Sequence, residues 1–206
     1  MSPDQFINIL ATLFVTIDPV GMIPIFLALT AGASFAERSK VAIQACLIAA
    51  VVLFVFIAVG NPLLSTLGVS LPAFRIAGGL LLFMIAVEMV FEKRTQRKAA
   101  TAEKANEDNH NVAVFPLAVP LIAGPGSISA LLLLTGQNPG AIAKLELAAA
   151  TSAILLVTLI AFLASGPIDR ILGATGRLVL TRLFGILLAA LSVQFVADGI
   201  LALSTT

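Results

Sequence analysis

Tryptophan and tyrosine are absent from this 206-residue chain, and cysteine and histidine occur once each, as Cys46 and His110. A single cysteine excludes an intramolecular disulfide and a cysteine cluster for a metal ion. A single histidine excludes most zinc sites and leaves little scope for a histidine-activated nucleophile. We therefore expect no metal site, no bound cofactor and no enzymatic activity.

Charged side chains are also scarce, at 11% of the chain against about a quarter in soluble domains. Apolar residues make up 59%, and the mean hydropathy is +1.08. A soluble core of this size cannot hide so much hydrocarbon, so the composition excludes a water-soluble globule and predicts the lipid bilayer as a partner. The net charge of +1 gives no electrostatic reason to expect nucleic acid.

Six long apolar stretches follow one another along the chain. An α-helix needs about 20 apolar residues to cross a bilayer, so we predict an all-α, polytopic membrane protein with six transmembrane helices. The expected spans are Phe6–Thr30, Val41–Leu63, Phe74–Phe91, Val112–Leu134, Leu145–Ser165 and Leu183–Leu203. We expect residues 1–206 to form a single membrane domain.

Lysine and arginine are distributed unequally between the two ends of these spans. Ten of the 12 fall in segments 31–40, 92–111 and 166–182, and the other two are Arg75 and Lys144. Cytoplasmic loops are enriched in these residues. We therefore predict that the three segments are cytoplasmic and that both termini lie outside, in a bacterial inner membrane. The first apolar run contains Asp18 and follows no basic residue, so we expect no cleavable signal peptide.

Similar short motifs recur in the two halves of the chain, 1–92 and 112–206, which a polar linker at 93–111 separates. The matching pairs are Asp18–Gly21 with Gly124–Ser127, Pro62–Gly68 with Pro167–Gly173, and Arg75–Gly78 with Arg182–Gly185. Each half holds three expected spans, and an odd number inverts the second half relative to the first. Two inverted three-helix repeats are a transporter architecture, with the binding site near the bilayer midplane between them.

Prolines interrupt the first and fourth expected spans. Five of the ten lie there: Pro19, Pro24, Pro116, Pro120 and Pro125. Proline removes a helical hydrogen bond, and lipid cannot satisfy the carbonyl that this leaves. We therefore expect helices 1 and 4 to be broken at midplane. Aspartate is a favoured N-cap residue, and proline is favoured in the first turn of a helix. The second half of each broken span should therefore begin at Pro19 or Pro125.

The two helix starts form a candidate binding site, because helix N-termini offer free N–H groups and partial positive charge. Asp18 would face an ammonium group or a cation, whereas the glycine-rich second start is free to take a carboxylate. A small zwitterionic solute fits both. The predicted substrate-binding residues are Thr16, Asp18, Pro19, Gly21, Gly124, Pro125, Gly126 and Ser127. Asp18 as a structural cap and Ser127 as a packing residue are the alternatives.

Five residues are candidates for coupling or gating: Asp18, Arg75, Glu88, Arg182 and Gln194. An ionisable group inside a membrane is functional by default, which applies most directly to Asp18. Arg75 and Arg182 begin the third and sixth spans, where they alternatively anchor the helices at the lipid headgroups. Glu88 and Gln194 lie toward span ends and are alternatively half-solvated.

Several segments resemble the signature segments of the MarC family of six-span inner-membrane proteins. They are Asp18–Gly21 with Pro24, Leu71–Gly79, and Pro120–Ser127. The resemblance covers nearly the whole chain. It implies a relationship to LysE-type amino-acid exporters and a role in moving small neutral amino acids.

We therefore predict a secondary transporter of small solutes, with small neutral amino acids as the first choice, that works by alternating access of inverted repeats. The chain has no phosphate-binding Gly-Lys-Ser/Thr motif, so transport would be passive or coupled to H⁺ or Na⁺. A non-transporting scaffold or sensor and an efflux protein for other metabolites or drugs are the alternatives. The prediction is compatible with a homo-oligomer.

Overall fold

The computed structural model describes residues 3–93, 96–97, 99, 111–137 and 140–204, and every regular element in these ranges is helical. In chain order the elements are α1 (Pro3–Ile17), α2 (Ile23–Leu29), α3 (Phe35–Thr66), α4 (Leu71–Val90), η1 (Ala113–Ile122), α6 (Pro125–Gln137), α7 (Ala141–Leu163) and α8 (Ser165–Ser204). The predicted all-α class is confirmed. Most of the expected linker at 93–111 lies outside the described residues.

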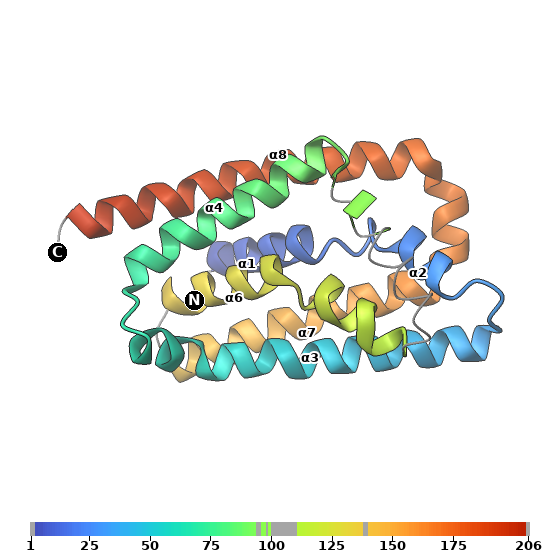
Figure 1. Cartoon of the computed structure of the whole chain (residues 1–206), viewed down its shortest axis with the longest axis horizontal. Helices are drawn as coiled ribbons and strands as arrows, with labels where there is room; N and C mark the ends of the chain where they lie inside the picture. Colours follow the sequence, from blue (N-terminus) through green and yellow to red (C-terminus); the bar gives the residue numbers. More distant parts are fainter. Residues whose placement is uncertain (1–2, 94–95, 98, 100–110, 138–139, 205–206) are drawn as a thin grey trace.

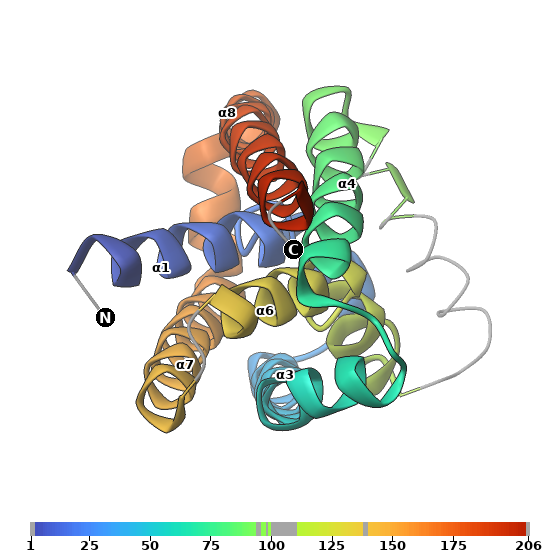
Figure 2. The ribbon, with the colours of Figure 1, turned by 90° about the vertical axis from the view of Figure 1, so that its left-hand side faces the viewer.

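Two pairs of long helices enclose two shorter helices. Figure 1 shows α4 and α8 side by side along one edge of the molecule and α3 and α7 along the opposite edge. In the end-on view of Figure 2, α1 and α6 lie between these pairs. The contact of α4 with α8 is the most extensive, followed by that of α3 with α7. Both termini lie toward the left-hand end of Figure 1.

Four helices are long and apolar enough to cross a bilayer: α3, α4, α7 and α8. η1 and α6 meet the same criterion together, as one span bent by 50°. α1 has 15 residues, fewer than the roughly 20 that a span needs, and α2 follows it only after a break. The protein is therefore a multi-pass helical membrane protein with four or five clear spans, and the sixth span stays a prediction.

Apolar side chains cover the outer faces of the long helices. Leu47 and Val51 of α3 and Leu187, Val193 and Leu201 of α8 are each more than half exposed. Continuous apolar surface of this kind marks a membrane or a protein interface. Lipid therefore accounts for the faces that the bundle itself leaves uncovered.

Serine caps fix where two of the long helices begin. The Ser34 hydroxyl accepts from the Glu37 N–H at 3.4 Å, and Glu37 Oε2 accepts from the Ser34 N–H at 2.8 Å. Ser70 caps α4 by accepting from the Ala73 N–H at 3.3 Å. Such caps contribute about 0.5–2 kcal/mol each. They start both helices ahead of the apolar runs from which the spans were predicted.

A lysine satisfies the carbonyl that a proline leaves without a partner in α3. Pro62 has no N–H to donate to the carbonyl of Ala58 four residues earlier. Lys144 of α7 donates its Nζ to that oxygen instead, at 3.0 Å. An unpaired carbonyl away from water would cost several kcal/mol. Lys144 thus joins α7 to α3 where the helical ladder of α3 is interrupted.

Small residues let α8 lie close to α4. Gly185, Ser192 and Gly199 are buried and recur at every seventh position of α8. A Cβ atom on Gly199 would lie 3.0 Å from the carbonyl oxygen of Pro72, and one on Gly79 would lie 2.9 Å from that of Ser192. In lipid, helices associate by this kind of close van der Waals packing rather than by the hydrophobic effect.

Substitution Lys144→Met should destabilise the protein by about 1–3 kcal/mol, because the Ala58 carbonyl loses its only replacement for a helical partner. In a Pro62→Ala background the same substitution should have a smaller effect, since the alanine N–H restores the helical bond. Denaturant unfolding of the four purified variants in detergent measures this double-mutant cycle. Equal losses in both backgrounds would show that Lys144 acts in some other way.

Substitution Gly79→Ala should destabilise the α4–α8 pair by about 1–3 kcal/mol, because the added methyl group meets backbone atoms of α8 that cannot rotate away. Gly176→Ala is the matched control: its Cβ would make only an ordinary contact, at 3.6 Å, with Leu172 of the same helix. Thermal unfolding in detergent compares the two. A melting temperature at or above the native value for Gly79→Ala would contradict the packing argument.

Candidate functional site

The first broken segment lies between α1 and α2, at residues 18–22. Asp18 has φ of +61°, in the left-handed region that aspartate tolerates better than most residues. Its Oδ1 accepts from the Gly21 N–H at 3.0 Å within the turn, whereas α2 has Met22 at its N-cap and no side-chain cap. The expected helix start at Pro19 is wrong, however, because α2 begins at Ile23. The Ile23 N–H bonds to the Val20 carbonyl three residues back, so the chain first makes a tighter turn.

The second broken segment lies between η1 and α6, at Ala123 and Gly124. α6 begins at Pro125, as predicted. The Ser127 hydroxyl donates to the Ile122 carbonyl at 2.6 Å and accepts from the Gly124 N–H at 3.1 Å. One buried side chain therefore joins the backbone on both sides of this break, and Ser127 has a structural role whether or not it touches a ligand.

The segment before the second break is not the regular half-helix that the sequence predicted. Phe115 and Val119 within η1 have extended backbone angles, near φ −130° and ψ 124°. Each precedes a proline, and the proline ring pushes the preceding residue out of the α region. η1 is therefore a wound segment interrupted twice, at Pro116 and Pro120, before the chain enters α6.

In both breaks a side chain accepts a hydrogen bond from the backbone N–H of a glycine, but the order of the two residues along the chain is reversed. In the first, the side chain of the leading residue, Asp18, binds the N–H of Gly21; in the second, the side chain of Ser127 binds the N–H of the leading Gly124. Each glycine is in close contact with its own break, Gly21 with a side chain and Gly124 with backbone. A Cβ atom on Gly21 would lie 2.2 Å from Asp18 Oδ2, and one on Gly124 would lie 2.2 Å from the Pro120 carbonyl oxygen.

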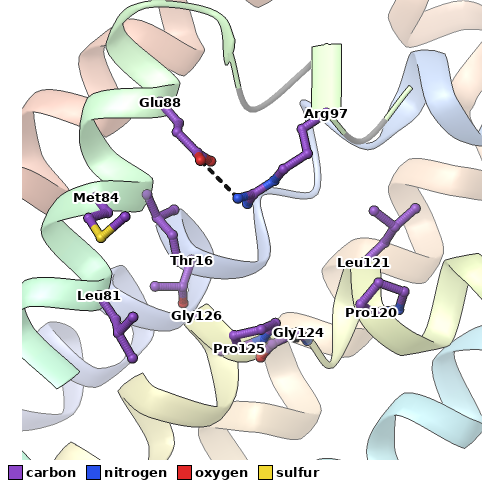
Figure 3. A pocket seen from close by; sticks show the side chains of 12 residues that line it. Thr16, Leu81, Met84, Glu88, Arg97, Pro120, Leu121, Gly124, Pro125 and Gly126 are labelled. Carbon is purple, nitrogen blue, oxygen red and sulfur yellow. Dashed lines mark hydrogen bonds and ion pairs between the residues drawn. The ribbon is translucent and has the colours of Figure 1, made fainter. Parts of the chain in front are cut away.

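A cavity of about 330 Å³ lies beside the second break. This is near the lower limit of small-molecule sites, which run from about 300 to 1,000 Å³. Figure 3 shows side chains of α1, α4, η1 and α6 converging on it, together with Arg97 from beyond the end of α4. The lining residues are Thr16, Leu81, Met84, Ile85, Glu88, Arg97, Pro120, Leu121, Gly124, Pro125, Gly126 and Ser127.

The cavity carries one carboxylate and one guanidinium group, and these bind each other. Arg97 donates to Glu88 Oε1 at 2.8 Å, across the upper part of the view in Figure 3. The Glu88 and Arg97 side chains are 23% and 60% exposed. Both are therefore within reach of a solute, in contrast to Asp18, which is only 3% exposed.

The structure brings most of the predicted binding residues together, but not all. Thr16 and the four residues Gly124–Ser127 line the cavity, and so does Glu88, which was predicted as a coupling or gating residue. Asp18, Pro19 and Gly21 are not among the lining residues, although Thr16 lies only two residues before Asp18. The zwitterion hypothesis in which Asp18 and Gly124–Ser127 share one ligand stays a prediction.

The remaining coupling candidates lie away from the cavity. Arg75 is partly buried in α4, and its Nε has no hydrogen-bond partner in the described part of the chain. Arg182 pairs with Glu92 at 3.4 Å, near the end of α4. Gln194 donates to Asp198 one turn further along α8, at 2.7 Å. These contacts are compatible with the interpretation of Arg182 and Gln194 as residues of helix surfaces.

Sequence reasoning missed half of the cavity wall. The residues not predicted are Leu81, Met84, Ile85, Arg97, Pro120 and Leu121. Four of these are apolar side chains in long apolar runs, where nothing distinguishes a cavity wall from a lipid-facing or core residue. Arg97 belongs to the basic segment 92–111, which the sequence analysis interpreted only as a cytoplasmic loop. Within the described ranges, no three histidine, cysteine, aspartate or glutamate side chains gather as a metal site would require.

Substitution Ser127→Ala should destabilise the protein by about 1–3 kcal/mol per unpaired group, because the Ile122 carbonyl and the Gly124 N–H both lose a buried partner. Thr135→Val is the matched control in the same helix, since the Thr135 hydroxyl bonds only to the carbonyl of Leu131 one turn earlier. Thermal unfolding in detergent gives both values. Equal shifts for the two variants would mean that Ser127 does not hold the break together.

Comparison with known proteins identifies the family. The model of the MarC family integral membrane proteins matches residues 4–204. A UPF0056 membrane protein of Archaeoglobus fulgidus is 38% identical over 191 residues, which cover 92% of this chain and 89% of that protein. The UPF0056 membrane protein YhcE of Escherichia coli is 35% identical over 190 residues, or 91% and 88% of the two chains. No solved structure matches. As the resemblance predicted, the chain belongs to the MarC family of integral membrane proteins.

Proposed function

We propose that this protein is a secondary transporter of small solutes, and that small neutral amino acids are its substrates. The observation that carries the proposal is the cavity beside the Gly124 break, inside an otherwise apolar helical bundle. Irregular backbone at membrane depth survives only where protein buries it or where it lines a cavity. A broken helix next to a solute-sized cavity is what transporters use to expose backbone groups to their cargo.

Many transporters that work by alternating access are built from two structural repeats, and one backbone feature supports such repeats here. Gly68 and Gly173, which the sequence comparison matched, both have positive φ, at +69° and +59°. Gly68 turns the chain between α3 and α4, and Gly173 bends α8 between a short first part and a long second part. If the long part of α8 corresponds to α4, the α4–α8 contact joins the two repeats along a shared face.

The proposal also includes six membrane crossings, with α1 and α2 as the first, in a bacterial inner membrane. The distribution of lysine and arginine favours cytoplasmic segments at 31–40, 92–111 and 166–182 and external termini. Figure 1 is compatible with this arrangement, because both termini lie toward one end of the bundle. Transport would be passive or coupled to an H⁺ or Na⁺ gradient, and the protein would not act as an enzyme.

The start of α6 suits the carboxylate end of an amino acid. The first turn of any helix has N–H groups without intrahelical partners, and the helix dipole is positive there. Gly126 presents no side chain toward the cavity, Ile85 packs against it, and Leu81 also belongs to the lining. A short apolar side chain of the solute would contact Leu81 and Ile85.

Purified protein in liposomes should take up labelled alanine, glycine or serine faster than protein-free liposomes do. Leu121→Trp should reduce the initial rate by about tenfold, which corresponds to about 1.4 kcal/mol, because the larger side chain occupies the cavity. Leu187→Trp places the same residue on the outer face of α8, where Leu187 is 56% exposed, and should leave uptake unchanged.

Uptake should be measured with and without imposed H⁺ and Na⁺ gradients, so that coupling is detected in the same experiment. Size-exclusion profiles in detergent confirm that both tryptophan variants are folded. Absence of flux for every small solute tested would exclude this proposal and favour a scaffold or sensor. Equal flux in the native protein and Leu121→Trp would exclude the cavity as the transport route.

A further inference from the structure

We propose that α6 is the element that moves when a solute passes, and that α4 and α8 stay joined beside it as a fixed frame. This inference rests on the proposed transport function and assigns its moving part. It follows from a difference between two kinds of helix contact. The close contacts of α8 with α4 include backbone atoms, whereas those of α6 with its neighbours are made by side chains.

The close contacts between α4 and α8 include backbone atoms at three levels. A Cβ atom on Gly79 would lie 2.9 Å from the carbonyl oxygen of Ser192, and one on Gly185 would lie 3.1 Å from that of Ala86. The contact of Gly199 with a carbonyl oxygen, described above, is the third. Backbone atoms cannot rotate away as side chains do, so α8 cannot slide along α4 unless the two helices first separate.

The same interface is reciprocal between the two halves of the chain. A Cβ atom on Gly79 would lie 2.8 Å from Cγ2 of Val196, and one on Gly185 would lie 3.0 Å from Cγ2 of Val90. Gly185 follows Gly79 by 106 residues, and Val196 follows Val90 by the same number, as do the two carbonyl oxygens named above. Reciprocal contacts of this kind are typical of elements related by a two-fold axis. Because α4 and α8 belong to different halves, this interface prevents the halves from rocking against each other as rigid bodies.

The α4–α8 interface is closed over almost the whole length of α4. Its contacts run from Pro72 to Val90, which is about 27 Å at about 1.5 Å per residue, close to the roughly 30 Å of a hydrocarbon core. Neither end of the interface is open to a solute. The path must therefore lie on the side of α4 that faces the cavity.

The close contacts of α6 with α3 and α4 differ in kind. In each of them the nearest atoms to a glycine of one helix are side-chain carbon atoms of a leucine or isoleucine of the other. The pairs are Gly60 with Leu132, Gly78 with Leu133, Gly126 with Ile85, and Gly136 with Leu71. Such side chains move between staggered rotamers, and packed helices slide past each other by small shear movements. α6 can therefore shift along α3 and α4 while it stays packed against them.

A shift of α6 would change the cavity directly. Figure 2 shows α6 inside the bundle, and it contacts both α3 and α4. Gly124–Ser127 at the start of α6 line the cavity together with Leu81 and Ile85 of α4. Movement of α6 against α4 changes the distance between these two parts of the wall, so the cavity opens or closes while the α4–α8 frame stays intact.

Two adjacent glycines of α4 offer a matched pair of cross-links, because Gly79 faces α8 and Gly78 faces α6. In a Cys46→Ala background, Gly79→Cys with Val196→Cys joins α4 to α8, and Gly78→Cys with Leu133→Cys joins α4 to α6. Oxidation to the disulfide should leave alanine uptake into liposomes unchanged in the first variant. In the second it should lower uptake by about tenfold or more, because the conformational step is blocked, and reduction should restore it.

A second α4–α8 pair keeps the test valid if one of these variants does not fold. Val90→Cys with Gly185→Cys lies toward the other end of the interface and should also leave uptake unchanged. Bifunctional thiol reagents of increasing span test the same distinction without transport. Both α4–α8 pairs should be joined by the direct disulfide and the shortest reagent alone, whereas the α4–α6 pair should also be joined by longer reagents.

Three results would overturn the assignment: loss of uptake on oxidation of an α4–α8 pair, unchanged uptake on oxidation of the α4–α6 pair, or the same range of spans for all pairs. Failure of the transport proposal gives a different result. In that case neither the native protein nor any reduced variant takes up alanine, but the range of spans still separates the α4–α6 pair from the α4–α8 pairs.

Discussion

The architecture depends on one constraint: every backbone group that a proline or a helix break leaves unpaired needs a partner from within the protein. Lipid offers no donors or acceptors, so each interruption must be satisfied locally. Lys144 does this for the Ala58 carbonyl, Ser127 for both sides of the Gly124 break, and Asp18 for the Gly21 N–H. These contacts place three of the few polar side chains of an apolar chain where no apolar residue could serve.

The same constraint locates the cavity. A continuous helix in place of η1 and α6 would fill the bundle interior with regularly spaced side chains. Its backbone N–H and C=O groups would be paired within the helix. The bend of 50° between the two segments instead brings Gly124–Ser127 to the surface of an internal space that α4 bounds on the other side. The long helices around it pair their backbone groups internally, so the irregular segments are the part of the bundle that can contact a solute through backbone groups.

Much of this arrangement could be predicted from residue chemistry. Proline and glycine change the backbone wherever they occur, and for this reason the positions of both breaks and the start of α6 at Pro125 were correctly predicted. The start of α2 was misplaced because the chain makes a tight turn after Asp18. This turn depends on the hydrogen bond from the Ile23 N–H to the Val20 carbonyl, which the motif Asp-Pro-Val-Gly does not specify. Extended backbone within η1 follows from its two prolines, and the prediction of a regular half-helix overlooked their effect on the residues before them.

The composition of the cavity could not be predicted in the same way. The hypothesis assumed that a polar side chain at a break faces the ligand. In the structure Asp18 Oδ1 accepts from the Gly21 N–H within its own turn. Arg97 reaches Glu88 only because α4 ends between them and the chain turns back, which is a tertiary effect without a sequence pattern. Apolar residues such as Ile85 carry no mark that separates a cavity wall from a lipid-facing surface.

The reversed order of cap and glycine at the two breaks restricts how the sequence can evolve. A side chain at position 21 overlaps the carboxylate of Asp18, and a side chain at position 124 overlaps the Pro120 carbonyl. In the first motif the overlap is with the cap itself, so a side chain at position 21 requires the Asp18 carboxylate to leave its place. In the second motif the overlap is with backbone, so position 124 stays glycine whichever residue supplies the cap. Conversion of an Asp-Pro-Val-Gly break into a Gly-Pro-Gly-Ser break avoids both overlaps when it passes through a form with glycine at both ends and no cap.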